Sequence, residues 1–305
     1  MLYRIVVSLC IVSIGFLFVF TGCDMLYSNS DGTDESDKTA KLAYAPWAEG
    51  IAYTNVAKIV LEQEMGYAVT LTEVDPAGGF AGIADGDQDA FMEVWPGLHQ
   101  NYIDQYGSSI SDLGKVYQGA QSGLVVPKYV YDAGVTSISD LTSDTAVQNF
   151  SGEITGIDAG SGIMRTIDDG TENDVMSVYG LDTAGYELVE GSGQSMTSAL
   201  ESVIGSQEWI VATAWKPHWI WAKWDLVFLQ QDKQVFWSAG DIHIYGREGL
   251  STDDSELAQF LQNMSFTDED LSALMLQIQE SSSDVATVAE QWVLDNAALV
   301  DSWVP

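Results

Sequence analysis

The sequence predicts an α/β protein in which two layered units follow one another along the chain. Short apolar segments alternate with longer segments whose apolar residues recur at helical spacing. Glycine or proline often stands where one kind of segment gives way to the other. Strands that alternate with helices are typical of layered sheets with mostly parallel strands. We therefore expect mostly parallel sheets covered by helices.

The first unit alternates strands with a helix. Apolar residues at Tyr67, Val69 and Leu71 alternate with smaller or polar ones, as in a strand with one buried face. A helix over Thr54–Met65 is followed by Gly66, and glycine is favoured just past a helix end. The strands expected here are Leu42–Ala45, Tyr67–Val74, Ala90–Val94 and Gly123–Val126.

The second unit repeats this pattern, with strands at Glu153–Ile157 and Trp209–Ala214 and a helix that begins at Gly162. Two further helices close the chain. The first follows a Thr267 cap with Asp270 three residues later. Their apolar faces are expected at Leu271, Leu274, Met275 and Ile278, and at Val285, Val288, Ala289 and Trp292.

Two chain crossings join the units, near Gly123–Val130 and Gln234–His243. We accordingly expect one lobe to comprise residues 41–124 and 244–305, and the other to comprise residues 125–243. A ligand cleft is expected between the lobes.

Residues 1–23 resemble a targeting segment. Arg4 precedes the apolar run Ile5–Phe20, which is shorter than the roughly 20 residues of a membrane span. Small residues before Cys23 resemble a lipobox, so Cys23 is the expected lipidation site of an extracytoplasmic, membrane-anchored lipoprotein. A plain signal peptide and a short N-terminal anchor are the alternatives. Residues 24–40 are expected to form a flexible acidic tether.

The charge balance excludes some partners. The formal net charge is −34, which argues against nucleic acid and anionic lipid headgroups. The hydrophobic content of 46% argues against a disordered acidic chain, so the acids are expected on a solvated surface typical of a salt-loving organism. Only Cys10 and Cys23 are present, and both belong to the targeting segment, so neither a disulfide nor a cysteine metal site is expected in the lobes.

Three tryptophans stand at equivalent places. Trp47, Trp95 and Trp215 each follow an expected strand. Open α/β sheets bind ligands beyond the carboxyl ends of their strands, so these side chains are expected to converge on one cleft. Core packing is the alternative for any single tryptophan, but three in the same topological place favour a binding site.

Tryptophan suits a trimethylammonium group. Such a cation has no N–H donors and carries a diffuse charge, which the negative faces of indole rings attract. Each desolvated cation–π contact can contribute up to about 2 kcal/mol, so a three-walled cage is compatible with micromolar affinity.

The glycine-rich segment Asp158–Met164 runs from a strand into a helix, and the N–H groups at such a turn can accept a carboxylate. His99, four residues after Trp95, is expected to donate a charge-assisted hydrogen bond to the same carboxylate. A surface or capping role is the alternative for this histidine.

These residues belong to a wider resemblance. Residues 41–303 resemble the glycine betaine substrate-binding proteins of ABC importers. The segments that carry the resemblance are Trp47–Ala52, Trp95–His99, Gly123–Pro127, Gly156–Met164 and Trp215–Trp219.

The resemblance implies a two-lobe periplasmic-binding-protein fold of type II character and capture of glycine betaine for an importer membrane subunit. It places the ammonium cage at Trp47, Trp95 and Trp215. It places the ligand carboxylate at His99 and at the amides of Gly162 and Ile163.

Two positions depart from the usual pattern or bear on ligand choice. Some members have tryptophan where this chain has Ser161. Glu49 stands where choline-preferring relatives carry an acidic residue, so choline and carnitine remain alternative ligands. His218 and Trp219 belong to a matching segment and are expected to pack rather than to bind.

Two rival classes have little support. A secreted hydrolase would need a Gly-x-Ser-x-Gly elbow or a His/Glu metal motif, and neither occurs in the sequence. A structural surface lipoprotein would need no aromatic cage. We therefore expect a binding protein without enzymatic activity, cofactor or metal site.

Overall fold

The computed structural model describes residues 38–237 and 240–305. The predicted targeting segment 1–23, with Cys23, and most of the tether lie outside these residues. The strands are β1 (Thr39–Tyr44), β2 (Ala68–Glu73), β3 (Ala90–Val94), β4 (Ile110–Pro127), β5 (Glu153–Thr155), β6 (Glu187–Val189), β7 (Ala212–Lys216), β8 (Leu226–Phe228) and β9 (Gly240–Arg247).

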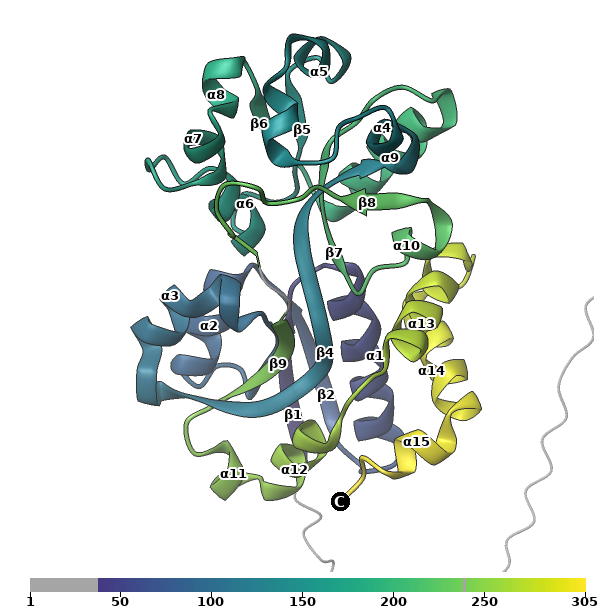
Figure 1. Cartoon of the computed structure of the whole chain (residues 1–305). Coiled ribbons are helices and arrows are strands. Elements are labelled where there is room, and N and C mark those ends of the chain that lie inside the picture. The colour runs from purple at the N-terminus through teal and green to yellow at the C-terminus, as the bar shows by residue number, and fades with distance from the viewer. Residues whose placement is uncertain (1–37, 238–239) are drawn as a thin grey trace, which may run out of the picture. The chain divides into compact units, whose positions relative to one another are not determined.

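Helices surround these strands along the whole described chain (Figure 1). The α-helices are α1 (Ala48–Gln63), α2 (Pro76–Ala84), α3 (Pro96–Tyr106), α4 (Lys128–Asp132), α5 (Asp144–Asn149), α6 (Gly162–Ile167), α7 (Val175–Tyr179), α8 (Leu181–Ala184), α9 (Gly193–Ser206), α10 (Ile220–Lys223), α11 (Leu250–Asp253), α12 (Ser255–Asn263), α13 (Asp268–Glu280), α14 (Val285–Asp295) and α15 (Ala297–Asp301). Short 3₁₀ turns lie at Gly107–Ser109 and Ile138–Thr142. None of the described helices has both the length and the hydropathy needed to cross a bilayer.

The strands are hydrogen-bonded in the order β2-β1-β3-β9-β4-β7-β5-β6, with β8 beside β4. The long strand β4 connects two groups of strands. Residues 110–120 of β4 pair with β9, and residues 121–127 pair with β7 and β8. Figure 1 shows β4 passing from the strands near α2 and α3 to those near α9 and α10. The chain therefore builds two α/β layers around one shared strand.

The prediction of mostly parallel sheets was wrong, because the sheet is mixed. Strand β1 runs parallel to β2 and β3, and β5 runs parallel to β6 and β7. Strands β4 and β9, which carry the chain between the two layers, pair antiparallel with their neighbours. Antiparallel pairing follows because a chain that crosses to the second layer and returns must reverse direction.

Several element bounds differ from the predictions. Helix α1 begins at Ala48, directly after Trp47, and not at Thr54. Strand β4 begins at Ile110, well before Gly123, because its polar, glycine-containing first half hides its strand character. Strand β7 spans Ala212–Lys216, so Trp215 lies inside it rather than after it.

Both closing helices begin at a side-chain cap, and the cap of the first is the predicted Thr267. Thr267 accepts the N–H of Asp270 at the start of α13, and Asp284 accepts the N–H of Thr287 at the start of α14. Both helices pack against α1, as Figure 1 shows in yellow beside purple. The apolar residues Leu271, Leu274 and Met275 of α13 are buried, which confirms the predicted face for these positions.

Candidate ligand-binding site

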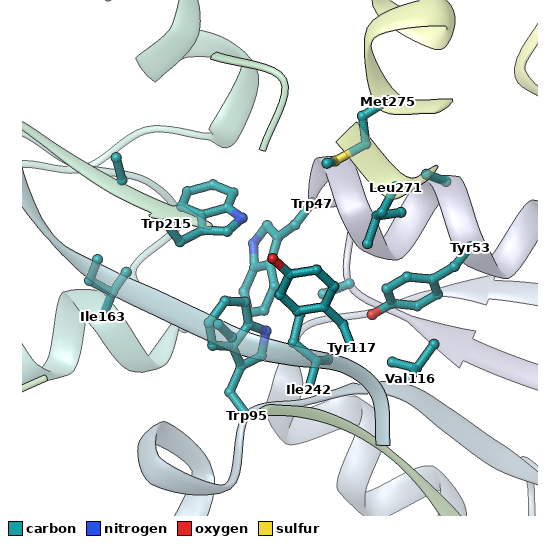
Figure 2. Packing of buried hydrophobic residues seen from close by; sticks show 14 of the residues in the cluster. Trp47, Tyr53, Trp95, Val116, Tyr117, Ile163, Trp215, Ile242, Leu271 and Met275 are labelled. Atoms are coloured by element: carbon teal, nitrogen blue, oxygen red, sulfur yellow. The ribbon is translucent and has the colours of Figure 1, made fainter. Parts of the chain in front are cut away.

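The three predicted tryptophans line one small cavity. Trp47 precedes α1, Trp95 precedes α3, and Trp215 lies near the end of β7. They are 6%, 7% and 4% exposed, so the cage faces are almost fully withdrawn from solvent. Figure 2 shows the three rings gathered around a common space, with Ile163 facing it from another element. The cavity is small: the centre of a water-sized sphere can occupy only about 20 Å³ of it.

Each of the three indole N–H groups donates to a carboxylate. The indole of Trp47 donates to Asp158 Oδ2 at 2.9 Å, that of Trp95 to Glu93 Oε1 at 2.7 Å, and that of Trp215 to Glu49 Oε2 at 2.8 Å. These bonds fix the orientation of the rings. A carboxylate that accepts the indole hydrogen also increases the electron density of the ring, which favours a cation at its face.

Glu49, predicted as a specificity residue, lies in the first turn of α1 and lines the cavity. Burial, and next the charge of Glu93, raise the pKa of Glu49 well above its usual value. Burial therefore favours the neutral form of this side chain and weakens the negative charge that the sequence suggested.

The glycine-rich turn enters the cavity from the second layer. Ser161 caps α6 by accepting the N–H of Met164. The N–H groups of Gly162 and Ile163 have no acceptor within the helix, because these residues begin it. Gly162 and Ile163, the predicted carboxylate positions, line the cavity together with Ser161. A Cβ at position 162 would lie 2.5 Å from Leu98 Cβ, so only glycine permits this approach of α6 to α3.

The structure changes the predicted role of His99. Its Nδ1 accepts the backbone N–H of Trp95 at 3.2 Å, and its buried Nε2 has no hydrogen-bond partner within residues 38–237 and 240–305. Burial, with the nearby charge of Arg165, lowers the pKa of His99 to about 3. The imidazole is neutral at physiological pH, so a bond to a ligand carboxylate would have a neutral N–H donor and a charged acceptor.

His99 also lies outside the wall of the cavity. Its ring lies 6.4 Å from that of Trp47 and meets the ring of Phe80 edge-on at 5.7 Å. Because Nδ1 is an acceptor, the hydrogen of the neutral ring belongs on Nε2. The predicted contact between His99 and a ligand therefore stays a prediction, with a neutral donor in place of a charged one.

His218 and Trp219 pack as the sequence predicted. Both are buried, and the His218 ring meets the Trp215 ring edge-on at 4.9 Å. Burial lowers the pKa of His218 to about 3, so this ring is also neutral. The two residues line a second, larger hollow that shares Trp47 and Trp215 with the cavity. They support Trp215 from the side of that hollow.

Sequence reasoning missed several residues of the site. Leu98, Ser122 and Ile157 line the cavity, and Glu93 and Asp158 hold two of the indoles. A usable signal existed for Glu93, because it is the only charged residue within the strand Ala90–Val94. Ser122 carried no such signal, since it reaches the site through its pairing with Trp215 in the neighbouring strand.

The arrangement defines a class of protein. Two α/β layers share a crossing strand, and an aromatic cavity combines residues from both, as in two-lobe substrate-binding proteins. The described residues hold no cluster of His, Cys, Asp or Glu suited to a metal ion. The family described as the substrate-binding domain of ABC-type glycine betaine transport systems matches residues 38–295. The chain belongs to this family.

Solved structures and a curated relative agree with this assignment. Lactococcal OpuAC in its closed, glycine betaine-bound conformation is 31% identical with a TM-score of 0.79, over 88% of this chain and 100% of that chain. The glycine betaine/L-proline-binding protein ProX of Borrelia burgdorferi is 30% identical with a TM-score of 0.81, over 88% of this chain and 97% of that one. These matches confirm the predicted two-lobe periplasmic-binding-protein fold.

The glycine betaine/carnitine transport binding protein GbuC of Listeria monocytogenes is 38% identical over 150 residues, which is 49% of this chain. The matched stretch spans about half of that relative, 48% of its length. Members of the family are transport binding proteins rather than enzymes. Substrate-binding proteins of ABC importers work outside the cytoplasm.

Proposed function

We propose that this chain captures glycine betaine, or a related betaine, outside the cytoplasm and delivers it to the membrane subunit of an ABC importer for osmoprotection. The observation that carries the proposal is the convergence of Trp47, Trp95 and Trp215 on one cavity that Gly162 and Ile163 also line. One end of this cavity suits a methylated ammonium group, and the other suits an anion.

The ammonium end works by cation–π attraction. The three indoles surround the cavity, and their N–H groups are occupied by carboxylates, so the ring faces rather than the ring edges are left for the ligand. A trimethylammonium group needs no hydrogen-bond acceptor, and dry aromatic faces compete well with water for it. A primary ammonium group would lose its hydrogen bonds to water there without replacement.

The carboxylate end relies on backbone donors. The amides of Gly162 and Ile163 begin α6 and face no helical acceptor, so they suit the carboxylate of a betaine. His99 is proposed as a third, neutral donor through Nε2–H. A ligand with both an ammonium and a carboxylate uses both ends of the site.

Choline is a second candidate, because Glu49 lines the cavity and an acidic side chain favours a ligand of net positive charge. Carnitine is another, because like a betaine it carries both a trimethylammonium group and a carboxylate. The curated Listeria relative is named for glycine betaine and carnitine. Protonation of Glu49 weakens the preference for a cation and leaves betaine as the favoured ligand.

The parts of the chain have separate proposed roles. Residues 1–23 direct export, Cys23 carries the lipid anchor, and residues 24–40 form the tether. The predicted lobes are 41–124 with 244–305, and 125–243. The strand pairings support boundaries a few residues from these, because β1 begins at Thr39 and β9 begins at Gly240.

Isothermal titration of the purified chain with glycine betaine, choline and carnitine tests the proposal. We expect micromolar dissociation constants for glycine betaine and weaker binding of choline, since choline lacks the carboxylate. Trp209→Ala is a matched control, because Trp209 packs on Phe150 away from the cavity. Absence of binding for all three ligands would refute the proposal, and tighter binding of choline than of betaine would favour the second candidate.

A further inference from the structure

Two buried glutamates lie together behind the aromatic cavity. Glu49 and Glu93 are both fully buried, and the two carboxyl groups act on each other directly. Glu93 packs on the first turn of α1 so closely that a Cβ at Gly50 would lie 2.3 Å from Glu93 Oε2. Glu49 holds Trp215 and Glu93 holds Trp95, so the pair supports two walls of the cage.

The hydrogen bonds of the two carboxyl groups differ. Glu93 accepts the indole N–H of Trp95 on Oε1 and the hydroxyl of Tyr53 on Oε2. Glu49 accepts the indole N–H of Trp215 on Oε2, but its buried Oε1 has no partner among the described residues. An oxygen that accepts no donor and adjoins a carboxylate is the natural place for a proton.

No lysine or arginine of the described residues forms an ion pair with either carboxyl group. Two unpaired negative charges in one buried place are very costly, and the pair lowers this cost by keeping a proton. In this state the site has at most one negative charge behind the cage.

We propose that Glu49 and Glu93 share one proton behind the cage above neutral pH and take up a second proton below it, and that this ionisation sets the preference of the site between zwitterionic and cationic quaternary ammonium ligands. This inference rests on the proposed function, because it concerns the ligand of the same cavity. It assigns a specificity role to Glu93, which does not line the cavity.

The direction of the effect follows from charge. A cation such as choline stabilises a carboxylate next to it, so its binding favours release of the proton from the pair. A betaine has no net charge, and its carboxylate opposes further negative charge in the site. Its binding therefore releases fewer protons than the binding of choline does. The affinity for choline relative to betaine should therefore rise with pH.

The pH window follows from the burial of the pair. Burial raises the pKa of Glu93 to about 7, although the bonds from Tyr53 and Trp95 act against this rise. The pKa of Glu49 is raised well above its usual value. The first ionisation of the pair thus falls near neutrality.

The other titratable groups that face the pair stay protonated in this window. Burial, with the nearby carboxylates, raises the pKa of Tyr53 on α1 and of Tyr117 on β4 far above neutrality. Figure 2 shows Tyr117 near Trp47 and Trp95.

His99 and His218, which lie beside cage rings, stay neutral in this window because burial lowers the pKa of each to about 3. Among these groups beside the cage, the change of charge between pH 5.5 and 8.5 therefore belongs to the two glutamates.

Calorimetric titration of the full chain with glycine betaine and with choline chloride, from pH 5.5 to 8.5, tests the inference. A ligand whose binding releases one proton has an association constant that rises by up to about tenfold per pH unit. We expect the choline-to-betaine ratio of association constants to rise about tenfold over this range. Repeating the choline titration in buffers of different ionisation enthalpy should detect proton release near pH 6.5.

Variants separate the pair from other causes. The double variant Glu49→Gln with Glu93→Gln should make the ratio independent of pH, and Glu93→Gln alone should move the pH at which the ratio changes. Glu64→Gln, an exposed change at the end of the same helix, should leave the profile of the parent chain unchanged. If the ratio changes at the same pH in Glu93→Gln as in the parent chain, Glu49 titrates alone, and the proposal of a shared proton is wrong.

The titrations of the parent chain test the inference even if a variant does not fold. Betaine binding with a flat ratio and no choline-linked proton release would overturn the inference and leave the proposed function in place. Failure of the parent to bind either ligand at any pH would instead overturn the proposed function.

Discussion

The indole of Trp47, at the start of α1, donates to Asp158 in the loop that follows β5, across the two layers of the fold. A second bond runs the opposite way, from Trp215 of β7 to Glu49 of α1. In these two bonds each layer supplies one cage ring and one carboxyl group that holds the ring of the other layer, whereas the third ring, Trp95, is held by Glu93 of its own layer. The cage is complete only when the two layers meet.

Removal of Asp158 should loosen this arrangement. We expect Asp158→Ala to weaken glycine betaine binding by roughly 10- to 150-fold, since a hydrogen bond to a charged group contributes about 1.5–3 kcal/mol when its partner is buried. Asp158→Asn keeps an acceptor for the indole and should recover part of the loss. Calorimetric titration measures both, with Asp144→Ala as a control on the exposed face of α5. Equal affinity in the parent and Asp158→Ala would show that Trp47 keeps its orientation without this bond.

The aromatic walls should each contribute to affinity. We expect Trp47→Ala, Trp95→Ala and Trp215→Ala each to cost about 1–3 kcal/mol of glycine betaine binding, from lost cation–π attraction and lost burial. Phenylalanine at the same positions keeps a ring face but no N–H donor, so it should retain part of the affinity. Binding like the parent in all three alanine variants would mean that the ligand lies elsewhere.

Sequence reasoning located the cage because its signals are local. Strand ends follow from short apolar runs and the residues that stop them, and Trp47 and Trp95 stand directly beside such ends. The contribution of Ser122 depends on antiparallel pairing between β4 and β7, which brings together residues far apart in the sequence. No periodicity within a single segment contains that information.

The charges of the site were harder to predict than its shape. The sequence suggested a hydrogen bond from His99 and an acidic side chain at Glu49 but not the protonation state of either, because both side chains are ionised or easily ionised in water. Burial favours the neutral form of both, since it disfavours the charged form of an acid and of a base alike. Burial depends on the complete tertiary packing, so the protonation states required the structure.

The acidic surface should make stability depend on salt. Acidic residues number 45 against 11 lysines and arginines, so the folded chain repels itself when screening is weak. The Debye length shortens from about 10 Å at 0.1 M salt to about 3 Å at 1 M. We expect the melting temperature to rise steeply with sodium or potassium chloride, by roughly 2–4 °C for each kcal/mol of repulsion relieved.

The shape of that rise identifies its cause. Screening acts mainly at low salt, whereas exclusion of salt from the protein surface grows steadily with concentration. Most of the change should therefore occur below about 0.5 M, where the Debye length shortens fastest. A profile that is flat from low to molar salt would remove the interpretation of a halophilic surface.

Acid should destabilise the fold through its buried neutral histidines. The pKa of His218 is about 3 in the folded chain, and an exposed histidine in the unfolded chain titrates near 6.5. Below pH 6.5 the unfolded state therefore binds more protons, and the stability contributed by the neutral ring is lost as the pH falls. Between pH 6.5 and pH 5 the loss is about 2 kcal/mol for this one residue.

His218→Asn isolates this contribution, because the asparagine oxygen can still accept the backbone N–H of Ile220 that His218 Nδ1 accepts at 3.2 Å. The buried Glu49 and Glu93 act in the opposite direction, since their raised pKa values make the folded state bind more protons over the same range. They are present in both chains, so their effect cancels in the comparison. Urea unfolding at pH 7.5 and pH 5 should show that the variant loses about 2 kcal/mol less than the parent over this interval. Equal losses in the two chains would mean that His218 titrates in the folded state much as it does in water.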